Sequence, residues 1–131
     1  MRRVLCAGVA ALLCAAVPAQ ARTVSYKNIV SPSKLISCIS VMGGTHEIEC
    51  SAPYLPRHQL DPYYALRPHG TAHLSERGDY PGYPHAGRHT VQYGDRWKRP
   101  GITCTMRPTG LTCTNLDGHG FVMAKGALRR F

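Results

Sequence analysis

The chain has 131 residues, which is the size of one domain, with 16 Lys and Arg, 7 Asp and Glu, and 6 Cys. No stretch has the roughly 20 consecutive apolar residues of a transmembrane helix, so the composition argues against an integral membrane protein. The formal net charge of +9 favours anionic partners, but it does not choose between nucleic acid, anionic polymers of the cell envelope and lipid headgroups.

The first 21 residues have the pattern of an export signal. Arg2 and Arg3 supply the positive amino-terminal region, and the run from Val4 to Val17 is apolar but too short to span a bilayer. Ala19-Gln20-Ala21 has the small-x-small form of a cleavage site. We therefore expect cleavage after Ala21, a single domain over residues 22–131, and a secreted or periplasmic monomer with no transmembrane span.

Cleavage would remove Cys6 and Cys14 and leave an even number of cysteines. The remaining four are Cys38, Cys50, Cys104 and Cys113. In an oxidising compartment two disulfides are expected, with three connectivities possible on paper. A domain of this size buries only about 65% of its unfolded surface, so covalent cross-links would contribute to its stability. A zinc site built from these cysteines is disfavoured because no close Cys-x-x-Cys pair is present.

The stretch from Ile102 to Asn115 predicts a β-hairpin. Apolar residues and cysteines alternate with threonines on both sides of Arg107-Pro108-Thr109-Gly110, which has the composition of a tight turn. Folding the chain between Pro108 and Thr109 sets Cys104 opposite Cys113. One face would be apolar and sulfur-bearing, and the other would be a row of threonines suited to water.

A second hairpin is expected from Leu35–Val41 and Ile48–Ser51, with its turn at Gly44. Pairing Cys38 with Cys50 gives the same turn position. Each disulfide can therefore form within its own hairpin. The alternative, in which disulfides join one hairpin to the other, stays open because all four cysteines face the expected core.

The other expected strands are shorter. Thr23–Val30 predicts a first strand that Ser31-Pro32-Ser33 ends, and Val91 and Tyr93 would share one face of a later strand. A last strand after Gly118-His119-Gly120 would carry Phe121 and Met123 on one side. The fold class is therefore mainly β: antiparallel hairpins in a sandwich-like or barrel-like domain.

Residues 53–90 differ in composition from both hairpins, with prolines, glycines, tyrosines and histidines at short intervals. We expect a long irregular loop here, because proline and glycine disfavour long helices and central strands. Short helical turns are candidates at Asp61–Leu66 and at Ala72–Arg77.

The histidines of this loop suggest a metal site, and two pairs have His-x-x-x-His spacing: His69 with His73 and His85 with His89. Such pairs bind metal from one face of a helix. Gly70 and Gly87 lie inside the pairs, so a regular helix is disfavoured and solvent-exposed loop histidines are the preferred interpretation. We therefore assign no cofactor and no metal ligand, and keep metal binding by this loop as an alternative.

A basic segment follows the loop. Its cations surround one tryptophan, and with His119 they are our candidate binding residues. The candidates are Arg96, Trp97, Lys98, Arg99 and His119. Cations beside an aromatic ring are typical of surfaces that bind anionic polymers, with Arg129 and Arg130 as further candidates. The competing interpretation places Trp97 in the core, with the cations only keeping the strand soluble.

Several of these segments resemble a family of small exported bacterial proteins grouped under a domain of unknown function. In that family a Ser-Pro-Ser-led strand with Cys precedes a second Cys, and the chain ends in a Gly-x-x-Cys-Thr-Asn strand and a Gly-His-Gly-Phe turn. The matching residues are Ser31–Ser33, Cys38, Cys50, Tyr93–Gly94, Ile102–Cys104, Gly110–Asn115 and Gly118–Phe121. The family's middle segment often carries another cysteine pair, which is absent between Cys50 and Cys104. The resemblance implies export, two disulfides and one small domain, but no activity and no catalytic residue.

The function predicted from the sequence is a non-catalytic binding module that contacts an anionic envelope polymer or an unidentified protein. The alternative is a small exported hydrolase such as a nuclease. It would use His119 with Asp117, or His46 with Glu47 or Glu49, in acid–base catalysis.

Overall fold

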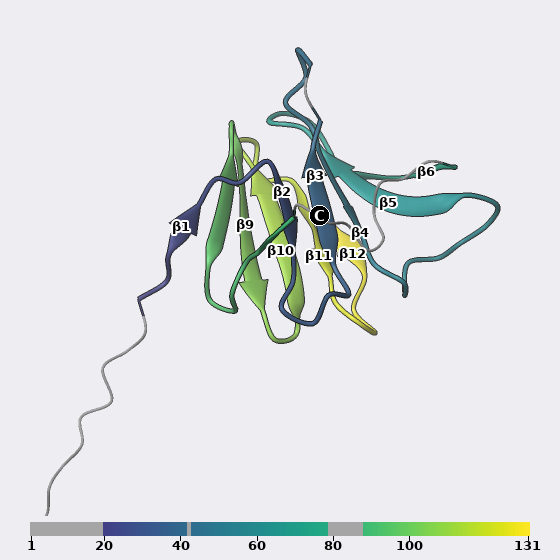
Figure 1. Cartoon of the computed structure of the whole chain (residues 1–131). Helices are drawn as coiled ribbons and strands as arrows, with labels where there is room; N and C mark the ends of the chain where they lie inside the picture. Colours follow the sequence, from purple (N-terminus) through teal and green to yellow (C-terminus); the bar gives the residue numbers. More distant parts are fainter. Residues whose placement is uncertain (1–19, 42, 79–87) are drawn as a thin grey trace, which may run out of the picture.

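Two β-sheets pack face to face and enclose one hydrophobic core (Figure 1). A computed structural model describes residues 20–41, 43–78 and 88–131, and within these ranges it contains strands but no helix. The part of the chain that is described therefore has no helix long and apolar enough to cross a membrane. The expected mainly β fold with two disulfides is confirmed.

Each sheet has six strands, in the order β1-β8-β9-β10-β11-β12 for sheet A and β6-β5-β4-β3-β2-β7 for sheet B. The strands of sheet A are β1 (Thr23–Val24), β8 (Arg96–Arg99), β9 (Ile102–Arg107), β10 (Gly110–Asn115), β11 (Gly120–Met123) and β12 (Arg129–Arg130). The strands of sheet B are β2 (Asn28–Val30), β3 (Ser37–Ser40), β4 (Ile48–Ser51), β5 (Asp61–Leu66), β6 (His73–Arg77) and β7 (His89–Thr90). Neighbours are antiparallel except for β1 with β8 and β2 with β7.

The β9–β10 hairpin has the predicted register. Cys104 pairs with Cys113, and Met106 pairs with Leu111, across a two-residue turn at Pro108 and Thr109. All four paired side chains are buried. Because side chains alternate across a strand, this register places the intervening threonines on the outer face of sheet A, where they are half-buried.

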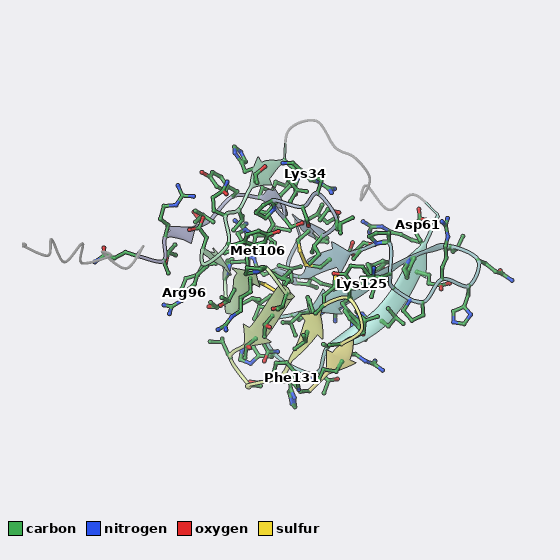
Figure 2. The ribbon with its side chains drawn as sticks, turned by 90° about the horizontal axis from the view of Figure 1, so that it is seen from below. Lys34, Asp61, Arg96, Met106, Lys125 and Phe131 are labelled. Carbon is green, nitrogen blue, oxygen red and sulfur yellow. A yellow bond between two sulfur atoms is a disulfide. The ribbon has the colours of Figure 1, made fainter. Side chains whose placement is uncertain are left out.

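The β3–β4 hairpin also follows the prediction. Cys38 pairs with Cys50, and the Val41 N–H donates to the Glu47 carbonyl at 2.8 Å, which centres the turn on Gly44. The disulfides join Cys38 to Cys50 and Cys104 to Cys113, so each lies within its own hairpin and the alternative connectivity is wrong. Figure 2 shows both bonds inside the molecule. All four cysteines are fully buried in the shared core.

The interior between the sheets is filled by aromatic and aliphatic side chains from both layers. The rings of Tyr64 and Phe121, one from each sheet, lie 5.2 Å apart. Trp97 is 1% exposed, and its Nε1 donates to the Tyr26 carbonyl at 2.7 Å. The indole therefore packs as a core residue whose only polar group is hydrogen-bonded. Phe121 and Met123 are both fully buried, as expected for one side of the last predicted strand.

The prediction of an irregular loop over residues 53–90 is corrected for three segments, because β5, β6 and β7 lie within this range. The two segments expected as helical turns are instead the strands β5 and β6. Proline has no backbone N–H to donate. Pro62 is tolerated in β5 because β4 pairs with β5 only from Tyr64 onward, so no backbone carbonyl of β4 needs an N–H from residue 62. The predicted His85–His89 pair cannot be assessed, since His85 lies outside the described residues.

Two smaller predictions are also corrected. The segment Thr23–Val30 is not one strand: β1 joins sheet A, β2 joins sheet B, and the chain crosses between the layers at Tyr26. Val91 and Tyr93 share no strand face, because Val91 is fully buried whereas Tyr93 is 44% exposed. The cause is a turn ending at Gly94, whose positive φ of 93° redirects the chain into β8.

Removing either disulfide should destabilise the domain. The Cys104–Cys113 bond closes a loop with a sequence separation of 9, for which the chain-entropy relation gives roughly 2.5–3 kcal/mol. Urea unfolding of the double substitution Cys104→Ala/Cys113→Ala should show this loss relative to the wild type. Cys38→Ala/Cys50→Ala is the matched control and should lose a similar amount, because its separation of 12 is only slightly longer. Unchanged unfolding midpoints in both variants would contradict this account.

Candidate functional site

Positive charge is concentrated in sheet A. Its strands contain six Arg or Lys residues and no Asp or Glu: Arg96, Lys98, Arg99, Arg107, Arg129 and Arg130. The strands of sheet B contain three acidic residues, Glu49, Asp61 and Glu76, and one cation, Arg77. The two layers of the sandwich therefore differ in the sign of their strand charges.

The outer surface of sheet A, which we call the threonine face, combines these cations with hydroxyl groups. It consists of Thr103, Thr105, Thr112, Thr114, Val122, Arg96, Lys98 and Arg129. One cross-strand row runs Arg96, Thr105, Thr112, Val122, Arg129, and each neighbour in it is a paired residue of the next strand. A second row contains Lys98, Thr103 and Thr114. The result is a cationic face with hydroxyl donors and acceptors between its charges.

The five predicted binding residues do not form one site. Arg96 and Lys98 flank buried Trp97 in β8, so both are exposed on the threonine face. Figure 2 shows Arg96 extending away from the body of the protein. The burial of Trp97 excludes it as a stacking platform for a ligand. Arg99 contacts the other layer, because it donates to Ser40 Oγ at 3.0 Å and to the Ser25 carbonyl at 2.8 Å.

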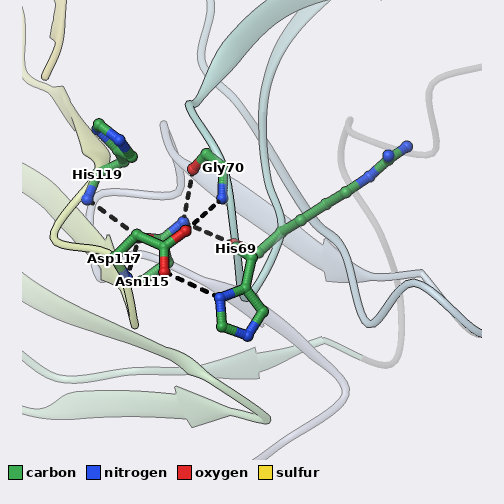
Figure 3. Close-up of polar contacts among 6 residues, drawn as sticks. His69, Gly70, Asn115, Asp117 and His119 are labelled. Atoms are coloured by element: carbon green, nitrogen blue, oxygen red, sulfur yellow. Dashed lines mark hydrogen bonds and ion pairs between the residues drawn. The ribbon is translucent and has the colours of Figure 1, made fainter.

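His119 belongs to a separate polar group, the Asn115 cluster, made of His69, Gly70, Asn115, Asp117 and His119 (Figure 3). Asn115 Nδ2 donates to the carbonyls of Arg67 and Gly70 at 2.9 and 2.7 Å. Its Oδ1 accepts the backbone N–H groups of Asp117 and His119 at 3.1 and 3.0 Å. One amide thus joins the β5–β6 loop to the β10–β11 turn.

Asp117 adds a charged contact to the same junction. Its carboxylate accepts the Gly70 N–H at 2.8 Å and lies 2.9 Å from His69 Nδ1. The Gly70 hydrogen bond, and then the His69 contact, hold the pKa of Asp117 below its usual value. The hydrolase prediction paired Asp117 with His119, but the imidazole that contacts this carboxylate is His69.

The second carboxylate near sheet A is Asp95, which holds the first residues of the described chain. Arg22 Nη2 lies 2.7 Å from Asp95 Oδ2, and the Arg96 N–H donates to the Arg22 carbonyl at 2.8 Å. The Arg22 hydrogen bond and the Gln92 N–H lower the pKa of Asp95, while its burial acts in the opposite direction. Arg22 also follows the expected cleavage site, so this contact would anchor the new amino-terminal residue.

The His46 arrangement proposed for a hydrolase does not form. Glu47 lies 2.7 Å from Arg67 Nε, and Glu49 lies 2.7 Å from Arg77 Nη2, so both carboxylates pair with arginines. His46 is in the β3–β4 turn with a positive φ of 48°. These acidic residues neutralise neighbouring cations instead of orienting an imidazole.

The histidines of the described ranges do not converge. His69 contacts Asp117, His73 lies in β6, and the His89 ring stacks on Tyr26 with centroids 3.9 Å apart. Among residues 20–41, 43–78 and 88–131, no three His, Cys, Asp or Glu side chains are grouped closely enough to hold a metal ion. The His69–His73 pair is part of a β-hairpin, where this spacing does not set both rings beside one ion.

The sequence alone did not show which strands are neighbours in sheet A, nor that His69 contacts Asp117. Arg129 was a further candidate for the basic surface, but the sequence did not show that β12 places it in the same cross-strand row as Arg96. The threonine alternation in 102–115 indicated an exposed face but gave no position for β8 or β11 beside it. The His69–Asp117 contact had no local signal, because 48 residues separate its partners.

No protein family, curated protein or solved structure matches the chain in comparisons of its sequence and fold. The resemblance to the exported bacterial family therefore stays a prediction. The functional argument depends on the chain's own residues.

Asp117 should titrate at an unusually low pH. Since its folded pKa lies below the unfolded value of about 3.9, its contacts stabilise the fold above that pH, and this stability is lost as the pH falls through the folded pKa. In an NMR titration, the Gly70 amide proton should shift with a midpoint below about 3.9. The shift should vanish in Asp117→Asn. A midpoint at or above the unperturbed value would contradict the hydrogen-bonded carboxylate.

Proposed function

We propose that this protein is a non-catalytic binding module that holds an anionic polymer of the cell envelope on the threonine face. The observation that carries the proposal is the segregation of charge: the strands of sheet A contain six cations and no carboxylate, and three of these cations, Arg96, Lys98 and Arg129, lie on the threonine face. Backbone phosphates or carboxylates of a polymer would meet no repulsive group from these strands. Sheet B, with three acidic strand residues, lacks this property.

The spacing of the face suits an extended ligand. Arg96 and Lys98 are two residues apart on one strand, which places them ~7 Å from each other along β8. Arg96 and Arg129 are four strands apart in one row, a distance of ~19 Å. Thr105 and Thr112 lie between them and offer hydroxyl groups for hydrogen bonds. A linear polyanion crossing the strands would contact cations at both ends of this row.

Export agrees with a ligand outside the cytoplasm. Two disulfides form in oxidising compartments, and the first 21 residues have the pattern of a signal peptide. Ala21 also borders a surface hollow lined by Arg96, Arg107 and Thr105. Cleavage after Ala21 would add the α-amino group of Arg22 at the edge of this cationic surface. The export prediction and the binding proposal thus support each other.

Neutralising the β8 cations should weaken binding. Arg96→Gln/Lys98→Gln should lower the affinity for long-chain polyphosphate and reduce the slope of log affinity against log salt concentration by about two, because each lost ionic contact releases one counterion fewer. Fluorescence anisotropy across a series of salt concentrations would measure both quantities. Polygalacturonate, as a carboxylate polymer, would show whether phosphate is required.

The matched control is Arg57→Gln/Lys34→Gln, which removes the same charge outside the threonine face. Arg57 pairs with Asp61 and Lys34 contacts Thr90, so neither belongs to sheet A. Equal losses in the two double variants would mean that net charge alone drives binding. Affinity that does not depend on salt, or no affinity for any polyanion, would reject the proposal.

A second candidate function is a small hydrolase such as a nuclease, and the His69–Asp117 contact is the observation in its favour. A carboxylate on Nδ1 orients an imidazole and leaves Nε2 as the nitrogen that could exchange a proton with a substrate. His69 is exposed at the β5–β6 loop, so a polymer could reach it.

Incubation of the pure protein with RNA, DNA and peptidoglycan, with and without chelator, would test this candidate. A hydrolase should lose activity in His69→Ala, whereas the exposed control His58→Ala should retain it. Absence of turnover on all three substrates, or equal turnover in both variants, would remove the candidate and leave the binding module.

A further inference from the structure

A cleft opens between the two sheets at one end of the sandwich, which we call the end cleft. Its volume is about 230 Å³. The β2–β3 connection borders it on the sheet B side, and the β9–β10 turn borders it on the sheet A side. Figure 2 looks onto this end of the molecule, with Lys34, Met106 and Lys125 marking its surroundings.

The end cleft has an apolar lining. Ile36 and Met106 are buried within it, at 4% and 1% exposure. Leu35 and Tyr93 also line it, yet they are 43% and 44% exposed. Two large apolar side chains from different segments thus remain open to water beside the same opening. An apolar partner entering there would cover both.

The segment that presents Leu35 is held by its own hydrogen bonds. Buried Ser31 donates its N–H to the Ile36 carbonyl at 2.8 Å, and its Oγ accepts the Ile36 N–H at 3.0 Å. Lys34, between them, has a φ of 62°, a conformation that a non-glycine residue adopts only at a cost. The exposure of Leu35 is therefore imposed by a formed turn, and this pre-organisation lowers the entropy lost on binding.

Two cations stand beside the apolar lining. Arg107 and Lys125 both border the end cleft and are exposed. Among the described residues, none that lines the end cleft is acidic. An occupant with an apolar group next to a negative charge would therefore be complementary in both respects.

We propose that the end cleft binds the carboxyl-terminal residue of a peptide whose last side chain is large and apolar. The side chain would pack against Leu35, Tyr93 and Met106, and the terminal carboxylate would accept hydrogen bonds from Arg107 and Lys125. The volume is below the range of about 300–1,000 Å³ of sites for drug-sized ligands. It suits a single side chain with its carboxylate, with the remainder of the peptide outside.

NMR titration with acetyl-Gly-Gly-Phe would test the proposal. Amide shifts should concentrate at Leu35, Tyr93, Thr109 and Lys125. The carboxyl-terminal amide of the same peptide should bind about tenfold more weakly, because it loses charge-assisted hydrogen bonds. Acetyl-Gly-Gly-Ala should also bind more weakly, because it buries less apolar surface.

Variants separate the two contributions. Leu35→Ala and Arg107→Gln should each weaken binding several-fold, and Arg107→Gln should remove most of the difference between acid and amide. The controls Leu116→Ala and Arg130→Gln change an exposed leucine and an arginine that do not line the cleft, and they should bind as the wild type does. Because these are local surface changes, spectra of each variant would verify that the fold is retained.

Three results would overturn the proposal: shifts that map elsewhere, equal binding of acid and amide, or no binding of any peptide. Tighter binding of 3-phenylpropionate than of the peptide would also overturn it, since the site would then serve a small free acid. Arg107 and Arg130 belong to sheet A, but neither lies on the threonine face, whose cations Arg96, Lys98 and Arg129 are unchanged in these variants. Failure here would therefore leave the polyanion proposal standing, and the reverse also holds.

Discussion

The inward orientation of four cysteines in two facing hairpins is the constraint on which the other features depend. Cys38–Cys50 and Cys104–Cys113 are cross-strand pairs, and all four side chains are buried between the sheets. Side chains alternate strictly along a strand, so a one-residue slip of either hairpin would turn its sulfurs away from the core between the sheets. The disulfides therefore hold the register of β3–β4 and β9–β10. They also reduce the conformational entropy of the unfolded chain.

The same register determines the outer face of sheet A. If Cys104 and Cys113 point inward, the threonines between them must point outward, and pairing with β8 then places Arg96 beside Thr105. Buried Trp97 has the corresponding effect in β8, because its inward position exposes Arg96 and Lys98 on either side. The threonine face is thus a direct consequence of how Cys104, Cys113 and Trp97 pack in the core.

This dependence explains which parts of the protein could be predicted from its sequence. The two hairpins were predictable in register because alternation, turn residues and cysteine spacing are all local and agree with one another. β5 was missed because Pro62 argues against a strand unless one knows that the backbone pairing of β4 with β5 ends at Tyr64. The Asn115 cluster was missed because Asn115 and Gly70 are 45 residues apart, and only the packed sandwich brings them together.

The cations of sheet A do not all require the same explanation. Arg129 and Arg130 form β12, a two-residue edge strand, and charged residues on an edge discourage pairing with another chain. Their presence could be accounted for by that role alone. β8 is covered by β1 at Arg96 and Trp97, so edge protection does not explain a cation at Arg96. The argument for a polyanion ligand therefore depends most strongly on β8, because protection of a sheet edge does not account for Arg96.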